Sequence, residues 1–520
     1  MKKTIYTLLF AFVFSACDQG FEELNVDPTK PVQVEARFKL TAAQLFTSGE
    51  RYENWRANLI YQSTMMQHMA NTAGFWDGDK YTWNMGYASS LMDRYYGNAV
   101  KTLEDILLQL DDEEQPDEMK SIARIMRVFV FHRLTDLYGD IPYSEAGKAV
   151  INRSAGTAFE EGPIAPKYDP QEEIYADLLN ELEESAAALG TGTSGFGDAD
   201  IIFNGDQGKW KRFANSMMLR LGLRLIKVDP AAAESWATKA IAGGVMESND
   251  DIAYMTHTPG PAGENRNGNG EVFTADGSPR MSKTFIDFLQ GDPRLTILAS
   301  LPGDTGNDNP DGSNITRTDA ERLDPAAQRG LPNGLDSQLL LEATGEQNTL
   351  GYSEPNRLLI TSEDAPMFFQ TYAEVEFMLA EAAVRWGLAG GDPEMHYNLG
   401  VRAAMKMLEL YGPAGAIADG DIADYIAANP FDSENALEQI NTQYWAATFL
   451  NEYEAFSNWR RTGFPILVPV NYPGNVTGGT IPRRLTYSTS EQSNNLENYQ
   501  AAIQRQGPDL LTTRVWWDVE

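Results

Sequence analysis

The sequence predicts a mainly α-helical fold with long loop-rich insertions. Segments that carry apolar residues at helical spacing recur from residue 40 onward. Several of them follow one another as pairs of the size that helical-repeat proteins use, although no sequence period is visible. Two stretches, 251–279 and 300–356, lack this pattern and are rich in Gly, Asn, Asp and Pro.

The first residues have the features of a lipoprotein signal peptide, which we predict over residues 1–16. Lys2 and Lys3 precede an apolar run that is too short to span a bilayer as a stable helix, and small residues come directly before Cys17. Cys17 is the only cysteine, so no internal disulfide can form, and we predict that its thiol carries a lipid. A plain secretory signal with a chance cysteine is the alternative.

A polar, proline-punctuated stretch follows the cysteine, and we predict a lipidated tether over residues 17–36. Residues 37–520 are predicted to form one folded domain. No later apolar run is long enough to cross a bilayer, so we expect a lipid anchor and not a spanning helix to hold the protein at its membrane.

Ten segments carry the helical pattern along the folded region. Asp169 and Pro170 precede one of them, and Asp229 and Pro230 precede another, as helix start signals. The predicted helices are Leu40–Phe46, Trp55–Met69, Tyr87–Leu110, Ser121–Tyr138, Gln171–Leu189, Trp210–Val228, Ala231–Gly243, Phe368–Trp386, Tyr397–Tyr411 and Gln443–Phe456.

The helix predicted over Ser121–Tyr138 is the centre of this scheme. One stripe of it is apolar and must pack on other helices, while Arg124, Arg127 and Asp136 lie off the stripe. Gly139 can adopt the backbone that ends a helix, and Pro142 cannot continue one. By itself, this segment indicates a buried helix with a tight exit.

The acidic composition limits the possible partners. The chain has 520 residues, with 41 Lys and Arg against 74 Asp and Glu, which gives a formal net charge of -33. A field of this sign repels phosphate backbones and anionic lipid, so nucleic acid is a poor candidate. The aromatic content of 11% is compatible with neutral ligands that bind by stacking.

Seven longer strings are spread over nearly the whole mature chain. They are L-T-D-L-Y-G-D-I-P-Y-S-E-A at 134–146, Y-D-P-Q-E-E-I-Y at 168–175, W-K-R-F-A-N-S-M-M-L-R-L at 210–221, G-D-P-R-L at 291–295, Y-A-E-V-E-F-M-L-A-E-A at 372–382, N-E-Y-E-A-F-S-N-W-R-R-T-G-F-P at 451–465 and I-P-R-R-L-T-Y at 481–487. In this order they closely resemble blocks of the SusD/RagB family of nutrient-binding outer-membrane lipoproteins. The branch they resemble is the SusD-like one, described as starch-binding-associated.

The resemblance implies a SusD-like fold with degenerate tetratricopeptide-like helical pairs. It implies a lipid-anchored protein that faces outward from the outer membrane of a Bacteroidetes cell, and the acidic Glu22 and Glu23 are similar to the export tag of such proteins. It further implies capture of an oligosaccharide and its delivery to a TonB-dependent SusC/RagA-like transporter. Capture of a peptide, as by RagB, is the alternative.

The sequence offers little support for an enzyme or a metal centre. It has no H-E-x-x-H string, no phosphate-binding G-x-x-x-x-G-K-[ST] string, and four histidines that lie far apart. Paired carboxylates of a surface glycoside hydrolase remain a less favoured alternative, and a structural protein without a ligand is a third. We predict no catalytic residues.

No cofactor is predicted, although one loop partly matches a calcium site. Asn307, Asn309, Asp311 and Gly312 occupy the first, third, fifth and sixth places of that pattern. Thr318 stands at the twelfth place, where a bidentate Glu is needed, so the match fails where affinity is set.

A ligand surface is predicted in G-F-W-D-G-D-K-Y-T-W-N-M-G-Y, residues 74–87, where five aromatics stand among Gly, Asp and Asn. Sugars bind with their C–H faces on aromatic planes while carboxylates and amides take the hydroxyls. On this chemistry we choose Trp76, Tyr81, Trp83 and Asn84 as ligand-binding residues. These aromatics could instead fill core or line a transporter contact.

The strings that resemble family blocks also contain residues for which we expect structural roles. Trp210, Phe213 and Leu219 are predicted core residues. Arginines in the last two blocks are expected to satisfy buried carboxylates or helix ends. They are Arg460, Arg461, Arg483 and Arg484.

Overall fold

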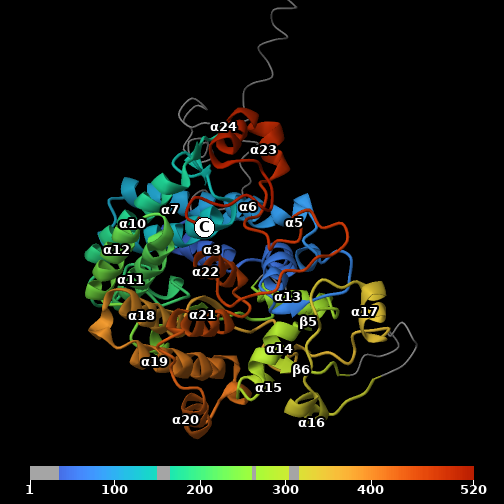
Figure 1. Ribbon diagram of the computed structural model, residues 1–520. Helices are drawn as coiled ribbons and strands as arrows, with labels where there is room; N and C mark the ends of the chain where they lie inside the picture. Colours follow the sequence, from blue (N-terminus) through green and yellow to red (C-terminus); the bar gives the residue numbers. More distant parts are fainter. Residues whose placement is uncertain (1–33, 149–163, 261–264, 304–314) are drawn as a thin grey trace, which may run out of the picture.

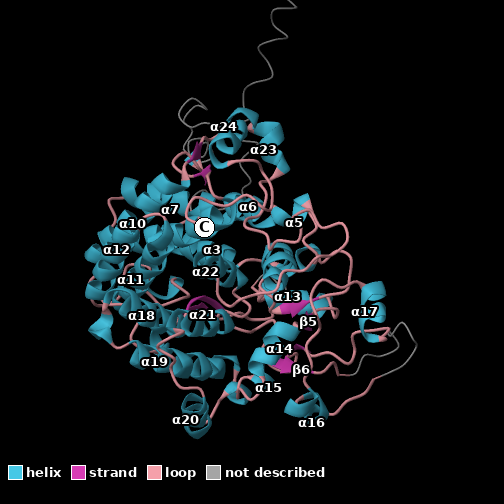
Figure 2. Cartoon of the chain, in the orientation of Figure 1, coloured by secondary structure: helices cyan, strands magenta, loops and turns pink. Residues whose placement is uncertain are grey.

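A computed structural model describes residues 34–148, 164–260, 265–303 and 315–520 (Figure 1). The predicted signal peptide, Cys17, most of the tether and the partial calcium loop at 307–312 lie outside these ranges. The described chain is mainly helical, as predicted, with short strands among long loops (Figure 2).

Helices of the first half follow the predicted order. They are α3 (Ala36–Ser48), α4 (Arg51–Glu53), the π-helix η1 (Asn54–Ser63), the 3₁₀ turn η2 (Asp77–Asp79), α5 (Met85–Ala88), α6 (Ser90–Tyr95), the π-helix η3 (Tyr96–Val100), α7 (Lys101–Asp112), α8 (Asp117–Tyr138), α10 (Gln171–Ala188), the 3₁₀ turn η5 (Gly197–Ala199), α11 (Gln207–Arg224), the 3₁₀ turn η6 (Leu225–Lys227) and α12 (Pro230–Gly243). The predicted helix 87–110 is thus divided into four pieces.

The second half adds shorter helices and a second helical group. Its α-helices are α13 (Gly268–Ala275), α14 (Lys283–Leu289), α15 (Leu295–Leu298), α16 (Asp319–Arg322), α17 (Ser337–Thr344), α18 (Tyr372–Trp386), α19 (Pro393–Lys406), α20 (Asp419–Ala428), α21 (Ala436–Ala447), α22 (Glu452–Thr462), α23 (Thr489–Asn494) and α24 (Leu496–Gln506). Its 3₁₀ turns are η7 (Asn249–Asp251), η8 (Pro325–Ala327), η9 (Ala389–Gly391), η10 (Met407–Tyr411) and η11 (Pro413–Gly415).

Successive helices pack as pairs and form an arc. Helix α3 packs on α7, α7 on α8, α8 on α10, α10 on α11 and α11 on α12, and the arc continues through α18 with α19 and α21. Figure 1 shows these helices stacked on one side of the molecule. The segments from α13 to α17 gather on the other side, so the predicted loop-rich insertions lie beside the helical arc.

The strands of the described chain form four two-stranded antiparallel ladders. Strand β1 (Met69–Ala70) pairs with β5 (Arg280–Met281), and β2 (Ile141–Pro142) pairs with β3 (Tyr168–Asp169). Strand β4 (Ala253–Met255) pairs with β8 (Met367–Gln370), and β6 (Ala299–Ser300) pairs with β7 (Glu354–Pro355).

Helix α8 lies at the centre of the core. Most of its side chains are buried, including Asp136 and Arg133 as well as the predicted apolar stripe. The helix ends at Gly139, whose φ is +81°, and a Cβ there would lie 1.6 Å from the Gln506 side-chain oxygen. Gln506 accepts a hydrogen bond from the backbone N–H of Asp140 and donates one to the carbonyl of Tyr138. The exit of α8 is therefore closed by the C-terminal helix α24.

Several predicted helices are wrong at a boundary, among them 55–69, whose last residue, Met69, belongs to strand β1. Residues 368–370 belong to strand β8, and α18 begins only after Thr371, whose hydroxyl accepts from the Glu374 N–H while Glu374 accepts from Thr371. Predicted helix 443–456 is broken between α21 and α22, where Leu450 has φ +71°. The carbonyl of Leu450 accepts hydrogen bonds from the distant Asn58 and Asn269, so tertiary contacts replace helical ones.

The short β-branched and aromatic stretches P-I-L-V-P-V at 465–470 and R-R-L-T-Y at 483–487 form no strand. They make isolated hydrogen bonds, such as Leu485 N–H to the Leu137 carbonyl. Trp210, Phe213 and Leu219 are buried in one connected core cluster that runs from Ala36 to Trp517, as predicted. Within the described ranges, no helix is both long enough and apolar enough to cross a membrane.

Candidate ligand-binding surface

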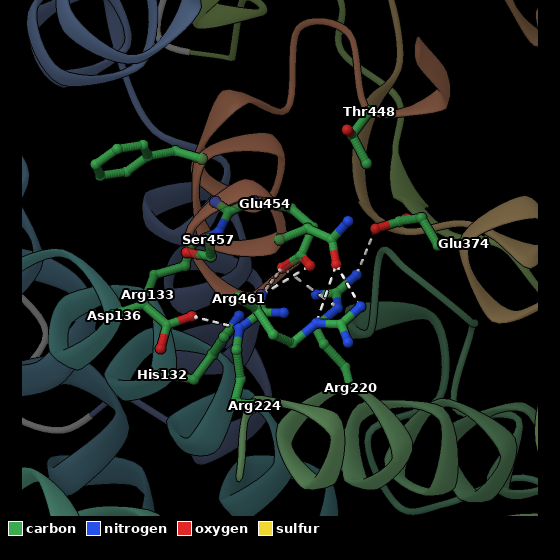
Figure 3. Close-up of polar contacts among 12 residues, drawn as sticks. His132, Arg133, Asp136, Arg220, Arg224, Glu374, Thr448, Glu454, Ser457 and Arg461 are labelled. Carbon is green, nitrogen blue, oxygen red and sulfur yellow. Dashed lines mark hydrogen bonds and ion pairs between the residues drawn. The ribbon is translucent and has the colours of Figure 1, made fainter. Parts of the chain in front are cut away.

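A network of buried charges lies where α8, α11, α18 and α22 meet (Figure 3). Arg220 Nη2 lies 2.7 Å from Glu374 Oε1, and Arg224 Nη2 lies 2.7 Å from both carboxylate oxygens of Glu454. Arg224 Nε lies 3.3 Å from Asp136 Oδ2. The two arginines of α11 thus bridge carboxylates from three other helices.

This network is closed to solvent and to substrates. The side chains of all five residues are at most 4% exposed, and the cavity beside them has a volume of only about 10 Å³. Burial acts to raise the pKa of Glu454, but Arg224 and Arg220 lower it below its usual value, so Glu454 is charged at neutral pH. We therefore assign the network to the scaffold.

Three of the four arginines near the end of the chain pair with carboxylates, as the sequence predicted, while Arg460 bonds to backbone carbonyls and to Ser457. Arg461 makes two hydrogen bonds of 2.6 and 2.7 Å to Glu381, and Arg484 pairs with Asp509 at 3.0 Å. Arg483 pairs with Asp518, and Arg460 donates to the carbonyl of Arg483. None of these four groups is available to a ligand.

The predicted ligand residues do not share one surface. Trp76 is fully buried and donates from Nε1 to Asp276 at 3.2 Å, and Tyr81 is 1% exposed, with its hydroxyl accepting from the Val470 N–H. Trp76 and Tyr81 therefore fill the core, which was the alternative interpretation of these aromatics. Asn84 is half-buried, and its side chain accepts from the Tyr87 N–H at the start of α5.

Trp83 is the one residue of the predicted four that presents an aromatic ring to solvent. Its side chain is 51% exposed, and its Nε1 donates to Thr486 Oγ1 at 3.0 Å. That single hydrogen bond leaves much of the ring open while it restricts the ring's orientation. Trp83 therefore has the geometry of a stacking platform.

Other polar residues of this stretch are engaged inside the protein. Asp79 accepts from Asn333 Nδ2 at 2.5 Å and from the Gly334 N–H, and burial raises its pKa to about 6. The ammonium of Lys80 donates to the carbonyls of Asn71 and Ala73. Asp79 thereby attaches its turn to Asn333 and Gly334 of the insertion 300–356. Asp79 and Lys80 therefore cannot bind sugar hydroxyls.

A loop with exposed apolar side chains adjoins the turn. Val476 donates from its backbone N–H to the carbonyl of Tyr81, and Val468 accepts through its carbonyl from Gln67 Nε2. The exposed fractions are 68% for Ile466, 75% for Val468 and 56% for Val476. We call Trp83 together with these three side chains the Trp83 surface.

A cavity of about 720 Å³ lies between the end of α3, α4, η1, α6 and α13. Phe75 and Tyr87, the outer aromatics of the predicted stretch, adjoin it: Phe75 packs edge-on against Trp55 at 6.2 Å, and Arg56 lies over the Tyr87 ring. Its lining residues include Leu45, Phe46, Gly49, Glu50, Arg51, Tyr52, Trp55, Arg56, Arg94, Arg266 and Glu271. We call this the arginine pocket.

Sequence reasoning missed the arginine pocket. The part of the pocket that is continuous in sequence is R-Y-E-N-W-R at 51–56, where an arginine stands beside each of two aromatics. The remaining wall, Arg94, Arg266 and Glu271, comes from later segments that no local pattern joins to it. Among the described residues, no group of three or more His, Cys, Asp or Glu could hold a metal ion.

Comparison with known proteins places this fold in context. A SusD-like family model, described as starch-binding and associating with the outer membrane, matches residues 28–488. A solved structure described as a chitin-binding protein is 35% identical, with a TM-score of 0.79, and the match covers 94% of this chain and 100% of that one. No curated protein matches the sequence significantly.

Two further solved structures have the same fold. A Bacteroidetes SusD-like protein is 28% identical with a TM-score of 0.79, over 94% of this chain and all of the other. A chitin-binding SusD homologue from Flavobacterium johnsoniae is 24% identical with a TM-score of 0.74, over 93% of this chain and 98% of the other.

Proposed function

Because the chain belongs to the SusD-like family of starch-binding proteins that associate with the outer membrane, we propose that it captures an oligosaccharide at the cell surface and delivers it to a TonB-dependent transporter of the SusC/RagA type. The family match across residues 28–488 carries this proposal. Members of the family are binding proteins and not enzymes, so a glycoside hydrolase is not proposed.

Within the Trp83 surface, the exposed ring of Trp83 itself is our proposed place for a neutral sugar. An exposed indole ring stacks on the C–H face of a pyranose, and the hydrogen bond from Trp83 Nε1 to the buried Thr486 fixes how the ring is presented. The 35% identical relative is described as chitin-binding. We therefore propose β-linked N-acetylglucosamine oligomers as the first ligands to test, with starch oligomers next.

Titration calorimetry with chitin, starch and peptide oligomers tests this function, and Trp83→Ala tests the surface. We expect Trp83→Ala to weaken oligosaccharide binding by about 1 to 3 kcal/mol, by analogy with base stacking on aromatics. The melting temperature should stay nearly unchanged, since half of the ring is already in water. Undiminished affinity in Trp83→Ala would exclude this surface, and binding of peptides alone would favour the RagB-like alternative.

The apolar side chains of the Trp83 surface are our proposed contact with the transporter. Contiguous exposed apolar side chains mark interaction sites, and Ile466 and Val468 are strongly exposed within one short loop segment. Extraction in mild detergents should recover a complex much larger than the monomer, with an interface of standard size or more. Val468→Lys should reduce that recovery without weakening oligosaccharide binding, and recovery of monomer alone in every mild detergent would contradict the proposal.

We further propose that Cys17 anchors the protein by a lipid, that residues 17–36 act as the tether, and that residues 37–520 form one domain facing the cell exterior. The position of Cys17 after an apolar leader and the outer-membrane association of the family support this arrangement. The test of the anchor is described with the other predictions.

A further inference from the structure

The arginine pocket concentrates positive charge in an otherwise acidic protein. Four guanidinium groups line it, from Arg51, Arg56, Arg94 and Arg266, against the two carboxylates of Glu50 and Glu271. The whole chain has a formal net charge of -33. At physiological salt the screening length is about 8 Å, so a charge inside the pocket responds mainly to these nearby groups.

Two of the four arginines have no carboxylate partner among the described residues. No Asp or Glu oxygen of the described chain lies within ion-pair distance of Arg51 or Arg56, whereas Arg266 lies 2.8 Å from Glu363. Arg94 is only loosely paired, at 3.8 Å from Glu50. The carboxylates therefore neutralise the four guanidinium groups only in part, and the pocket keeps a net positive charge.

Aromatic rings hold these guanidinium groups in place. The Arg56 Cζ lies 3.8 Å from the Tyr52 ring centroid, and the Arg94 Cζ lies 4.7 Å from the same centroid. The Arg51 Cζ lies 5.7 Å from the Trp55 ring. Stacking occupies the face of a guanidinium and not its edge, which matches the two oxygens of a carboxylate. One donor of the Arg56 edge, Nη1, bonds to the Tyr52 carbonyl at 3.0 Å.

We propose that the arginine pocket is a second binding site, which takes the carboxylate of an acidic sugar such as a uronate residue. Arg51 and Arg56 would bind the carboxylate, while the rings of Phe46 and Trp55 provide apolar wall for the sugar. The volume of about 720 Å³ is within the usual range for small-ligand pockets. That the carboxylate belongs to a sugar rests on the proposed glycan-binding function. That the pocket prefers a negatively charged ligand rests on its own arginines.

Titration calorimetry on the full mature protein, at 50 and 500 mM NaCl, tests the site with three size-matched probes. They are trigalacturonate, its methyl ester, which has the same rings without the charges, and the neutral N-acetylglucosamine trimer. We expect trigalacturonate to bind at least tenfold more tightly than its ester at 50 mM NaCl, and this advantage to shrink at 500 mM.

Variants then locate the charge preference. Arg51→Gln, at an exposed position, should weaken trigalacturonate binding at least tenfold, as expected for loss of a hydrogen bond between charged groups, and Arg56→Gln should do the same. Lys239→Gln is the matched control, because it removes one positive charge from an exposed position on α12. We expect no change in that control.

The outcomes separate this site from the proposed function. Equal binding of acid and ester, or unchanged binding of trigalacturonate in both arginine variants, overturns the acidic-sugar site even if the neutral trimer still binds. Binding of a triglutamate peptide as tightly as trigalacturonate overturns the assignment to a sugar. Failure of all oligosaccharides to bind overturns the proposed function together with this inference.

Discussion

The buried charge network offers a sharp test of what holds the fold together. Glu454 accepts two 2.7 Å hydrogen bonds from Arg224 and one of 2.8 Å from the Tyr444 hydroxyl, and its nearest oxygen lies 3.6 Å from Arg220 Nε. Glu454→Gln keeps the shape of the side chain but places amide hydrogens where a guanidinium needs an acceptor. Arg224 would then keep only Asp136, at 3.3 Å, as a charged partner.

The expected cost follows from burial. Removal of one partner from a buried ion pair costs about 3 to 5 kcal/mol, because the remaining charge cannot be rehydrated. Roughly 460 residues are described, and about 2.1 cal/mol/K per residue gives an unfolding entropy of about 1 kcal/mol/K. Glu454→Gln should therefore lower the melting temperature by about 3 to 5 °C.

Scanning calorimetry, with urea unfolding as a second measurement, compares this variant with Glu183→Gln. The control breaks the pair of Glu183 with Lys239, in which both side chains are 45% exposed, and such pairs contribute about 0 to 1 kcal/mol. Its melting temperature should fall by less than about 1 °C. If Glu454→Gln behaves like Glu183→Gln, the network does not stabilise the junction of α8, α11 and α22 as argued.

Three further predictions concern burial, pH and the anchor. Trp76→Ala should cost about 3 to 5 kcal/mol of stability, because it opens a cavity in the core, and a melting temperature as high as that of Trp83→Ala would contradict its burial. Burial raises the pKa of Glu53 from 4.5 to about 7, against the hydrogen bond that its carboxylate accepts from the Glu50 backbone N–H, so the stability of the native protein should fall as pH rises from about 4.5 to 7. Relative to the native protein, Glu53→Gln should gain up to about 3 kcal/mol between pH 5 and 8 in urea unfolding, and a pH-independent difference would refute the shift. Cys17→Ser should release the protein from the membrane fraction or leave an uncleaved precursor, and unchanged fractionation would argue against lipidation.

Local sequence patterns predicted much of the helical scaffold. Helical spacing is a property of residues three and four apart, so it is visible without the partner helix. Asp229 and Pro230 start α12 as predicted, since a cap is a local hydrogen bond between neighbours. The same locality explains the errors. The local pattern predicts a helix at Phe368, but Phe368 pairs with Tyr254, over a hundred residues away, and lies in a strand.

The choice of ligand-binding residues within 74–87 stays a prediction. The five aromatics of this stretch are visible in the sequence, but nothing within it distinguishes the buried Trp76 from the exposed Trp83. Trp76 is hydrogen-bonded to Asp276, and Tyr81 is hydrogen-bonded to Val470. Both partners come from segments far along the chain.

The sequence by itself determined the helical periodicity, the helix start signals and the family blocks, all of which rest on neighbouring residues. Only the tertiary structure decided which aromatic ring faces water and that Arg51, Arg94 and Arg266 line one pocket. Burial and cavity formation depend on which distant segments pack over a residue, and this information is spread over the whole chain and absent from any local pattern.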